Sequence, residues 1–231
     1  MTDTAHEVAD GVVLVLAAFE PELATMRGAL DRQGSVTGGV PVALHAIGIG
    51  LSAAAAGAAL RLCEHRPRLA ILVGTCGAYA GSGLSVGDCV VARRVHLVEP
   101  CALPELGGLM QLPTPPMRVA FDTDRATSAG LQSVGAAAGD LATTLGVTVD
   151  DRAADAIARA TGAHVEHMEA HGVGAACEAV GVPFAAVLGV ANVVGSGARE
   201  QWRTHHREAA AAANRLVLEW VARGSPGIPE R

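Results

Sequence analysis

Three polar side chains that could do chemistry, the carboxylates Glu22 and Glu169 and the amide Asn192, each follow an apolar stretch typical of a buried strand. A carboxyl group at the edge of an apolar sheet has a raised pKa unless it is paired, and it can then act as a general base near neutral pH. For either acid alone, an exposed position at the start of a helix is the alternative interpretation. The joint pattern favours one shared site.

Other residues have the chemical type of a metal ligand or a nucleophile but lack the expected context. His167 and His171 lie four positions apart around Glu169, but no glutamate directly follows His167, as a zinc-protease motif would need. We therefore predict no metal site, and either histidine then lines a pocket or is packed or solvated. Cys76 has no evident base beside it, so we interpret it as a small buried residue.

Apolar and amphipathic stretches alternate along the chain and would position these side chains. Predicted strands cover residues 12–18, 41–47, 69–73, 86–97, 141–148, 163–168 and 183–190. Predicted helices cover about residues 20–32, 52–64, 151–160, 170–180 and 200–223. Glycines follow two of the strands: Gly48 and Gly50 either end a strand or offer N–H groups to a ligand, and Gly74 and Gly77 free the backbone to approach one.

This alternation predicts a single-domain α/β fold over residues 1–231, with three αβα layers around a twisted, mixed and mostly parallel sheet. Ligands of such folds bind outside the carboxyl ends of the strands, which is where the three polar side chains are expected. Residues 1–11 are expected to be flexible and residues 224–231 to form a tail. The proline-rich stretch 99–117 is predicted to be a long irregular loop.

Composition excludes several classes of protein. The formal net charge of −6 is spread thinly, so nucleic acid is not an expected partner. Arg93 and Arg94 are interpreted as a solvated strand end, with a contact to an anionic substrate as the alternative. The five cysteines show no C-x-x-C spacing, which fits a reducing cytoplasm better than a disulfide framework. Because no apolar run approaches the roughly 20 residues of a membrane span, we expect a soluble, cytoplasmic protein that is not exported.

Several motifs resemble, in order, those of the nucleoside phosphorylase and nucleosidase superfamily. They are Ala17-Ala18-Phe19-Glu20-Pro21-Glu22-Leu23, Gly48-Ile49-Gly50, Val73-Gly74-Thr75-Cys76-Gly77-Ala78, Val86-Gly87-Asp88, Val165-Glu166-His167-Met168-Glu169-Ala170, Gly181-Val182-Pro183-Phe184 and Val190-Ala191-Asn192. The resemblance covers about residues 12–220. It implies the nucleoside phosphorylase-like fold and cleavage of the bond between a ribose and a purine.

The motifs also bear on whether water or phosphate attacks the sugar. The acid pair after the first strand resembles the nucleosidase form, and Leu72 stands where purine phosphorylases carry a phosphate-binding arginine. Thr75 and Cys76-Gly77 instead resemble the phosphorylases. Hydrolysis is the leading hypothesis. A purine nucleoside phosphorylase, a methylthioadenosine/adenosylhomocysteine nucleosidase and a non-catalytic purine-binding homologue are the alternatives.

Within the superfamily, Gly146-Val147-Thr148-Val149, Asn192, Val194-Gly195, Arg199 and Trp202 are most similar to the futalosine hydrolases, which release hypoxanthine in menaquinone biosynthesis. The resemblance implies three catalytic residues: Glu22 on the water, Glu169 on the ribose hydroxyls and Asn192 on the base. Expected substrate-binding residues are Gly50, Thr75, Cys76, Gly77, Val147, Met168, Arg199 and Trp202. We expect no cofactor, a small-molecule nucleoside as the partner, and a homodimer or larger homo-oligomer.

Overall fold

The computed structural model describes residues 11–33, 36–37, 39–100, 103, 106 and 119–230. Its strands are β1 (Val13–Ala17), β2 (Val36–Thr37), β3 (Val40–Ala46), β4 (Leu69–Ala78), β5 (Cys89–Leu97), β6 (Ala120–Asp122), β7 (Ala137–Thr143), β8 (Val165–His167) and β9 (Phe184–Val193). Its helices are the 3₁₀ helix η1 (Glu20–Leu23) and α1 (Ala24–Gln33), α2 (Leu51–His65), α3 (Arg125–Gln132), α4 (Asp151–Thr161), α5 (Ala170–Val180) and α6 (Ala198–Ala222).

The strands within these ranges form one mixed sheet. Its order is β2-β3-β1-β4-β8-β7-β5-β6, and β9 pairs with both β4 and β5. Strands β4, β8, β7, β5 and β9 therefore close on themselves at one end of the sheet, while β1 and β3 extend it at the other. Five pairings are parallel and four are antiparallel.

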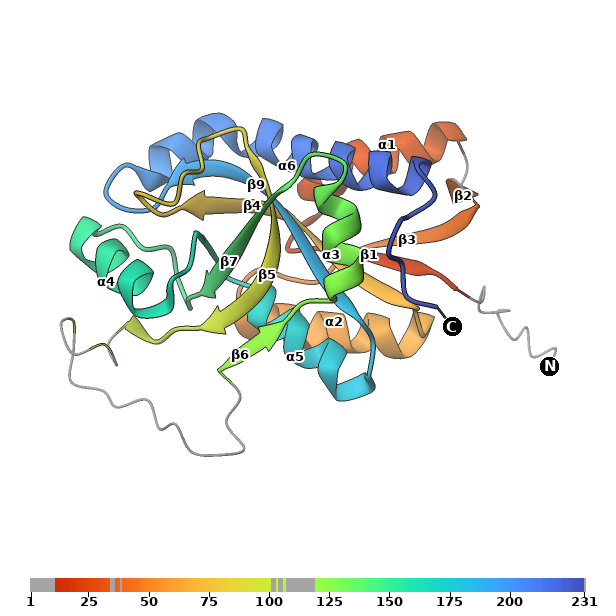
Figure 1. The fold of residues 1–231 in the computed structure, drawn as a ribbon, viewed down its shortest axis with the longest axis horizontal. Coiled ribbons are helices and arrows are strands. Elements are labelled where there is room, and N and C mark those ends of the chain that lie inside the picture. Colours follow the sequence, from red (N-terminus) through yellow and green to blue (C-terminus); the bar gives the residue numbers. More distant parts are fainter. Residues whose placement is uncertain are drawn as a thin grey trace.

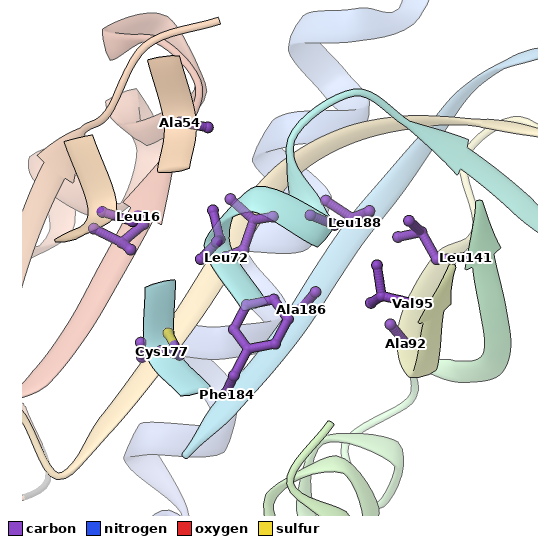
Figure 2. Packing of buried hydrophobic residues seen from close by; sticks show 14 of the residues in the cluster. Leu16, Ala54, Leu72, Ala92, Val95, Leu141, Cys177, Phe184, Ala186 and Leu188 are labelled. Carbon is purple, nitrogen blue, oxygen red and sulfur yellow. The ribbon is translucent and has the colours of Figure 1, made fainter. Parts of the chain in front are cut away.

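Helices cover both faces of the sheet. Figure 1 shows α1 and α6 along one face and α2 and α5 along the other. Because side chains alternate between faces along a strand, Leu14 and Leu16 of β1 join the cluster under α2 and α5, whereas Val13 and Val15 join the cluster under α1 and α6. Figure 2 shows members of the first cluster, to which six strands and two helices contribute. The predicted three-layer α/β fold is thus confirmed.

Several predicted element boundaries were wrong. The strand predicted at 141–148 is β7, which begins at Ala137 and ends at Thr143, because small residues pair with β5 there and the chain then turns away. Strand β4 does not stop at Val73 but runs to Ala78 with a bulge between Cys76 and Gly77, and β9 runs on to Val193. Strands β2 and β6 and helix α3 were not predicted from the sequence, because they are short and weakly apolar.

Flexible or irregular structure was also predicted for the two termini and for the proline-rich stretch 99–117. Residues 1–10 and most of the predicted loop at 99–117 lie outside the described residues. The predicted tail is docked, since the indole of Trp220 donates to the carbonyl of Pro226 at 3.0 Å and Ser225 is buried. None of the helices in the described ranges combines the length and apolarity that crossing a membrane would require.

Candidate active site

A pocket of about 540 Å³ opens at the carboxyl ends of β1, β4, β8 and β9. Figure 1 shows β4 and β9 pointing toward the end of the sheet where α6 begins. The predicted site residues that line the pocket are Glu22, Thr75, Cys76, Gly77, Val147, Met168, Glu169, Asn192, Arg199 and Trp202. The tertiary structure therefore brings the two acids and the amide, which are far apart in sequence, to one cavity.

Glu22 projects from η1, the turn that follows β1. Its carboxylate Oε1 accepts hydrogen bonds from the main-chain N–H of Thr75 at 3.0 Å and from the Thr75 hydroxyl at 3.1 Å. Its Oε2 is buried and has no hydrogen-bond partner among the described residues. A Cβ atom on Gly74 would lie 2.9 Å from Oε1, so glycine at this position makes room for the carboxylate. The arrangement leaves one Glu22 oxygen available to a ligand.

The surroundings of Glu22 bring its pKa close to neutral pH. Burial raises the pKa of Glu22 to about 7, the hydrogen bonds from Thr75 oppose that rise, and the nearby Glu169 charge adds to it. A carboxyl group with this pKa can accept a proton from water at neutral pH. The neighbouring Glu20 differs, because its exposed carboxylate pairs with Arg27 on the surface.

Glu169 lies at the start of α5 and is buried. Its Oε1 accepts a hydrogen bond from the main-chain N–H of Gly50 at 2.7 Å, so that N–H binds a carboxylate of the protein. The Nδ1 of His167 lies 3.2 Å from Oε2 and also accepts from the Glu169 main-chain N–H at 3.2 Å. Burial lowers the pKa of His167, so its ring is neutral and this contact is not an ion pair at neutral pH. The neutral ring therefore adds no positive charge beside the Glu169 carboxylate.

Asn192 is buried near the end of β9, where its backbone is paired with that of Gly77. A Cβ atom on Gly77 would lie 2.7 Å from the Asn192 amide nitrogen, which shows how closely the amide lies over β4. That nitrogen donates one hydrogen bond to the carbonyl of Val193 at 3.0 Å. An amide NH₂ group has two donors, so a second is available to a ligand.

The first turns of α6 form another wall of the pocket, with Arg199 and Trp202. The indole N–H of Trp202 donates to the Thr75 hydroxyl at 3.2 Å. Thr75 in turn donates to Glu22, so Trp202, Thr75 and Glu22 form a chain of hydrogen bonds. This chain orients the Thr75 proton toward Oε1 of Glu22.

The structure also separates the pocket residues from the other candidates. His171 lies outside the pocket and packs its ring against Phe121. Burial raises the pKa of the Cys76 thiol well above its usual range, which keeps it protonated. Arg93 and Arg94 pair with Asp140 and Asp122 on the surface, as a solvated strand end would. Within the described ranges, no three side chains of metal-ligand type gather to hold a metal ion.

His167 lines the pocket, as one of its two interpretations allowed, and so do six residues that were given no role from the sequence: Ala18, Phe19, Ile49, Val149, Glu166 and Ala198. Phe19 and Ile49 lie inside motifs that resemble the superfamily, so their position in a loop next to a predicted site residue was the available signal. Glu166 lies inside the motif that contains Met168 and Glu169, so the same signal was available for it.

A sequence model described as the Phosphorylase superfamily matches residues 15–222. No curated protein matches the chain. Among solved structures, a 5'-methylthioadenosine/S-adenosylhomocysteine nucleosidase from Colwellia psychrerythraea in complex with adenine aligns with a TM-score of 0.79 and 20% identity, over 96% of this chain and 98% of that one.

Two further solved structures share the fold. The corresponding nucleosidase from Neisseria meningitidis, in complex with methylthio-immucillin-A, has a TM-score of 0.78 and 21% identity, over 92% of this chain and 99% of that one. A futalosine hydrolase mutant of Helicobacter pylori strain 26695 has a TM-score of 0.79 and 15% identity, over 93% of this chain and 99% of that one.

Proposed function

The chain belongs to the Phosphorylase superfamily, and from that premise we propose that it is a nucleosidase that hydrolyses the N-ribosidic bond of a purine nucleoside. One observation carries the proposal: Glu22, Glu169 and Asn192 line a single pocket of about 540 Å³. Departure of a purine leaves an oxocarbenium-like ribosyl centre, so an enzyme must stabilise that cation, the leaving base and the incoming water together. Two acids and an amide supply one group for each task.

In the proposed mechanism, the free Oε2 of Glu22 takes a proton from water as the oxygen of that water bonds to the anomeric carbon of the ribose. Glu169 binds the ribose hydroxyls, and its negative charge stabilises the developing positive charge on the sugar. The Asn192 amide donates to the purine, on which negative charge collects as the C–N bond breaks. The base leaves as an anion and takes a proton from solvent water, and Glu22 later releases its proton to solvent, so the products are the neutral purine and the free sugar.

The hydrogen bonds of Thr75 favour water over phosphate as the attacking group. Its hydroxyl accepts from Trp202 and donates to Glu22, so its proton is committed to the carboxylate. Glu22 and Glu169 also place two acids in the pocket, and negative charge at this position repels a phosphate dianion. These contacts support hydrolysis, although Thr75 itself resembles the residue of a phosphorylase.

The proposed substrate class is a 6-oxopurine nucleoside, and futalosine is the specific candidate. An amide donor suits the O6 or N7 acceptors of a 6-oxopurine. The sequence resemblance implies a substrate tail with a benzoate, and the guanidinium of Arg199, at the pocket wall, is a suitable partner for that group. The fold is shared with a futalosine hydrolase, which agrees with this choice. It is also shared with a methylthioadenosine/adenosylhomocysteine nucleosidase, so an adenine nucleoside is the alternative substrate.

Self-association is part of the same proposal. Ile49, Val147 and Val149 line the pocket yet are 62%, 55% and 59% exposed, and the neighbouring Leu145 is 62% exposed. Exposed apolar side chains grouped at one place are typical of a protein–protein contact. We therefore propose that a second copy of the chain covers this rim.

A nucleoside screen tests the proposed function. The protein is incubated with futalosine, inosine, methylthioadenosine and adenosylhomocysteine, each in phosphate-free buffer and again with added phosphate, and the free base is measured by chromatography. We expect hypoxanthine from futalosine without phosphate and no acceleration by phosphate. Strict dependence on phosphate would make the protein a phosphorylase, preferential adenine release would reassign the substrate, and binding without release of base would indicate a non-catalytic protein.

The first prediction concerns the pH dependence of hydrolysis. Because the pKa of Glu22 is raised to about 7 and the base must be ionised, kcat/KM is expected to rise with pH up to about 7 and then level off. Below pH 7 the rate should fall about tenfold for each pH unit. In Thr75→Val this limb should move to higher pH, since the Thr75 hydrogen bonds lower the pKa of Glu22. A flat profile between pH 5 and 8 would argue against Glu22 as the base.

The second prediction concerns the choice of base. In Asn192→Asp, burial should keep the new carboxyl group protonated, so that it can donate a proton to N7 and accept a hydrogen bond from the 6-amino group of adenine. The ratio of adenine release to hypoxanthine release is expected to rise roughly tenfold or more. Both rates are measured with adenosine and inosine as a matched substrate pair. An unchanged ratio would remove Asn192 from base recognition.

A further inference from the structure

A third buried carboxylate, Glu166 of β8, lies at the pocket wall and has no part in the proposed hydrolysis. It is 6% exposed, and burial raises its pKa while hydrogen bonds from Thr148 and Tyr79 oppose that rise. Burying a carboxylate is unfavourable unless the surrounding groups satisfy it. The groups that satisfy Glu166 therefore indicate what it does.

Thr148 is held by Glu166 through two bonds. Glu166 Oε1 accepts from the Thr148 main-chain N–H at 2.9 Å, and Oε2 accepts from the Thr148 hydroxyl at 2.6 Å. Oε2 also accepts from the Tyr79 hydroxyl at 3.0 Å. Burial and the Glu166 charge raise the pKa of Tyr79, so the phenol keeps its proton and remains a donor. The paired bonds fix both the backbone and the side chain of Thr148.

The segment around Thr148 needs such an anchor. Val147 and Val149 on either side line the pocket and are largely exposed, so their own packing does little to hold the segment in place. The Thr148 carbonyl accepts from the N–H of Gly195 at 3.2 Å, three residues beyond Asn192. Thr148 thus joins Glu166 to the segment that follows β9, the strand that carries Asn192.

The pairing of strands β8, β4 and β9 places Glu166, Gly77 and Asn192 side by side across the sheet. Gly77 of β4 is paired with Glu166 of β8 on one side and with Asn192 of β9 on the other. Glu166 and Asn192 therefore occupy equivalent positions on the two strands that flank Gly77. Among the described residues, the hydrogen bonds of Glu166 reach neither Glu22 nor Glu169. The Glu166 network is confined to the part of the site assigned to the base.

We propose that Glu166 is a positioning residue for purine recognition: through Thr148 it fixes the segment Val147 to Val149 relative to Asn192, so that the base enters a preformed slot. This rests on the proposed function, in which the pocket takes a purine nucleoside. Glu166 acts through Thr148 and takes no part in proton transfer. Its loss is expected to weaken binding of the base and to leave the chemical step nearly unchanged.

Three variants test the proposal. Glu166→Gln removes the negative charge and replaces one acceptor oxygen by an NH₂ group, so the bond from the Thr148 hydroxyl must reverse its direction or break, and the charge-assisted strength of both bonds is lost. Thr148→Val keeps Glu166 and the shape of residue 148 but removes the hydroxyl. Tyr79→Phe is the matched control, because it removes the third donor without changing Thr148. For each, kcat, KM and the melting temperature are measured, with the Kd of free hypoxanthine and free adenine by calorimetry.

We expect Glu166→Gln to raise KM and the Kd of the preferred free base by about tenfold, with kcat reduced less than about threefold. Thr148→Val should raise the same two constants by a smaller factor, and Tyr79→Phe should leave them within about twofold. A fall in kcat with KM and the base Kd unchanged would overturn the proposal, as would wild-type values in both Glu166→Gln and Thr148→Val.

The design separates this inference from the proposed function. If Glu166→Gln fails to fold, Thr148→Val decides, because it retains the buried carboxylate and one of the two bonds. If the wild-type protein releases no base from any nucleoside, the proposed function fails, but the Kd of free base in the three variants still tests the role of Glu166. A wild-type protein that binds neither free base would overturn both.

Discussion

Replacing Glu22 by glutamine is expected to reduce kcat for base release by about 10²- to 10⁴-fold, the range typical of a lost general base. The reason is that Oε2 of Glu22 has no hydrogen-bond partner among the described residues and is available to take the proton of water, which an amide cannot do. Nucleoside binding should be nearly unchanged, since glutamine has the same shape. The checks are kcat at saturating nucleoside and the nucleoside Kd by calorimetry.

The matched control for this variant is Glu20→Gln on the same 3₁₀ turn. Glu20 is exposed and pairs with Arg27, so its replacement should leave kcat within about twofold of wild type, as expected for a surface ion pair. Equal losses in the two variants would mean that the charge of the turn matters and that Glu22 is not the base. A fully active Glu22→Gln would remove Glu22 from the mechanism.

The stability of Glu22→Gln shows whether a loss of activity comes from unfolding. The pKa of Glu22 is raised from 4.5 to about 7, so the folded state binds more protons than the unfolded state in this range. The contribution of Glu22 to the free energy of unfolding is therefore fully present below pH 4.5 and is lost as the pH rises through 7. At pH 8 the ionised side chain costs roughly 3 kcal/mol. The variant should accordingly melt at no lower temperature than wild type at pH 8, with a smaller advantage at pH 5.

Replacing Glu169 by glutamine is expected to reduce kcat/KM by about 10²- to 10³-fold, comparable to the loss of one transition-state-stabilising group. The fixed position of the carboxylate, with Gly50 donating to Oε1 at 2.7 Å, lets it act on the ribose without first being ordered. Glutamine keeps an acceptor oxygen for the N–H of Gly50 but removes the negative charge that stabilises the sugar cation.

A matched substrate pair isolates the interaction of Glu169 with the ribose. Wild-type protein should hydrolyse a ribonucleoside much faster than its 2'-deoxy analogue, because the carboxylate binds the 2'-hydroxyl. In Glu169→Gln the ratio of the two rates should shrink toward unity. Once the carboxylate is gone, removing the 2'-hydroxyl from the substrate no longer breaks an interaction with it. If the preference stays at the wild-type value, Glu169 does not act through the 2'-hydroxyl.

The order of elements and most of the site-bearing strands could be predicted from the sequence. Continuous apolar runs such as Val12 to Ala18 identify buried strands, and β1 is indeed fully buried. Strand β7 was misplaced because its first residues are Ala137, Ala138 and Gly139, which lack the bulky side chains of a strand pattern. The structure places them in register with β5, which a local pattern cannot show.

By itself, the sequence determined that two of the three side chains would meet. Glu22, Glu169 and Asn192 each come after a predicted strand, and the parallel strands β1, β4 and β9 bring Glu22 and Asn192 to one edge of the sheet. Strand β8, which precedes Glu169, is antiparallel to β4, so it was the tertiary structure that placed Glu169 beside them. The tertiary structure alone decided what each group is free to do. Thr75 and Trp202 lie 127 positions apart and together leave a single Glu22 oxygen open, and burial rather than residue type raises the pKa of that acid to about 7. Such contacts depend on how distant segments pack, because hydrogen bonding and desolvation are properties of the surroundings that no local stretch of sequence contains.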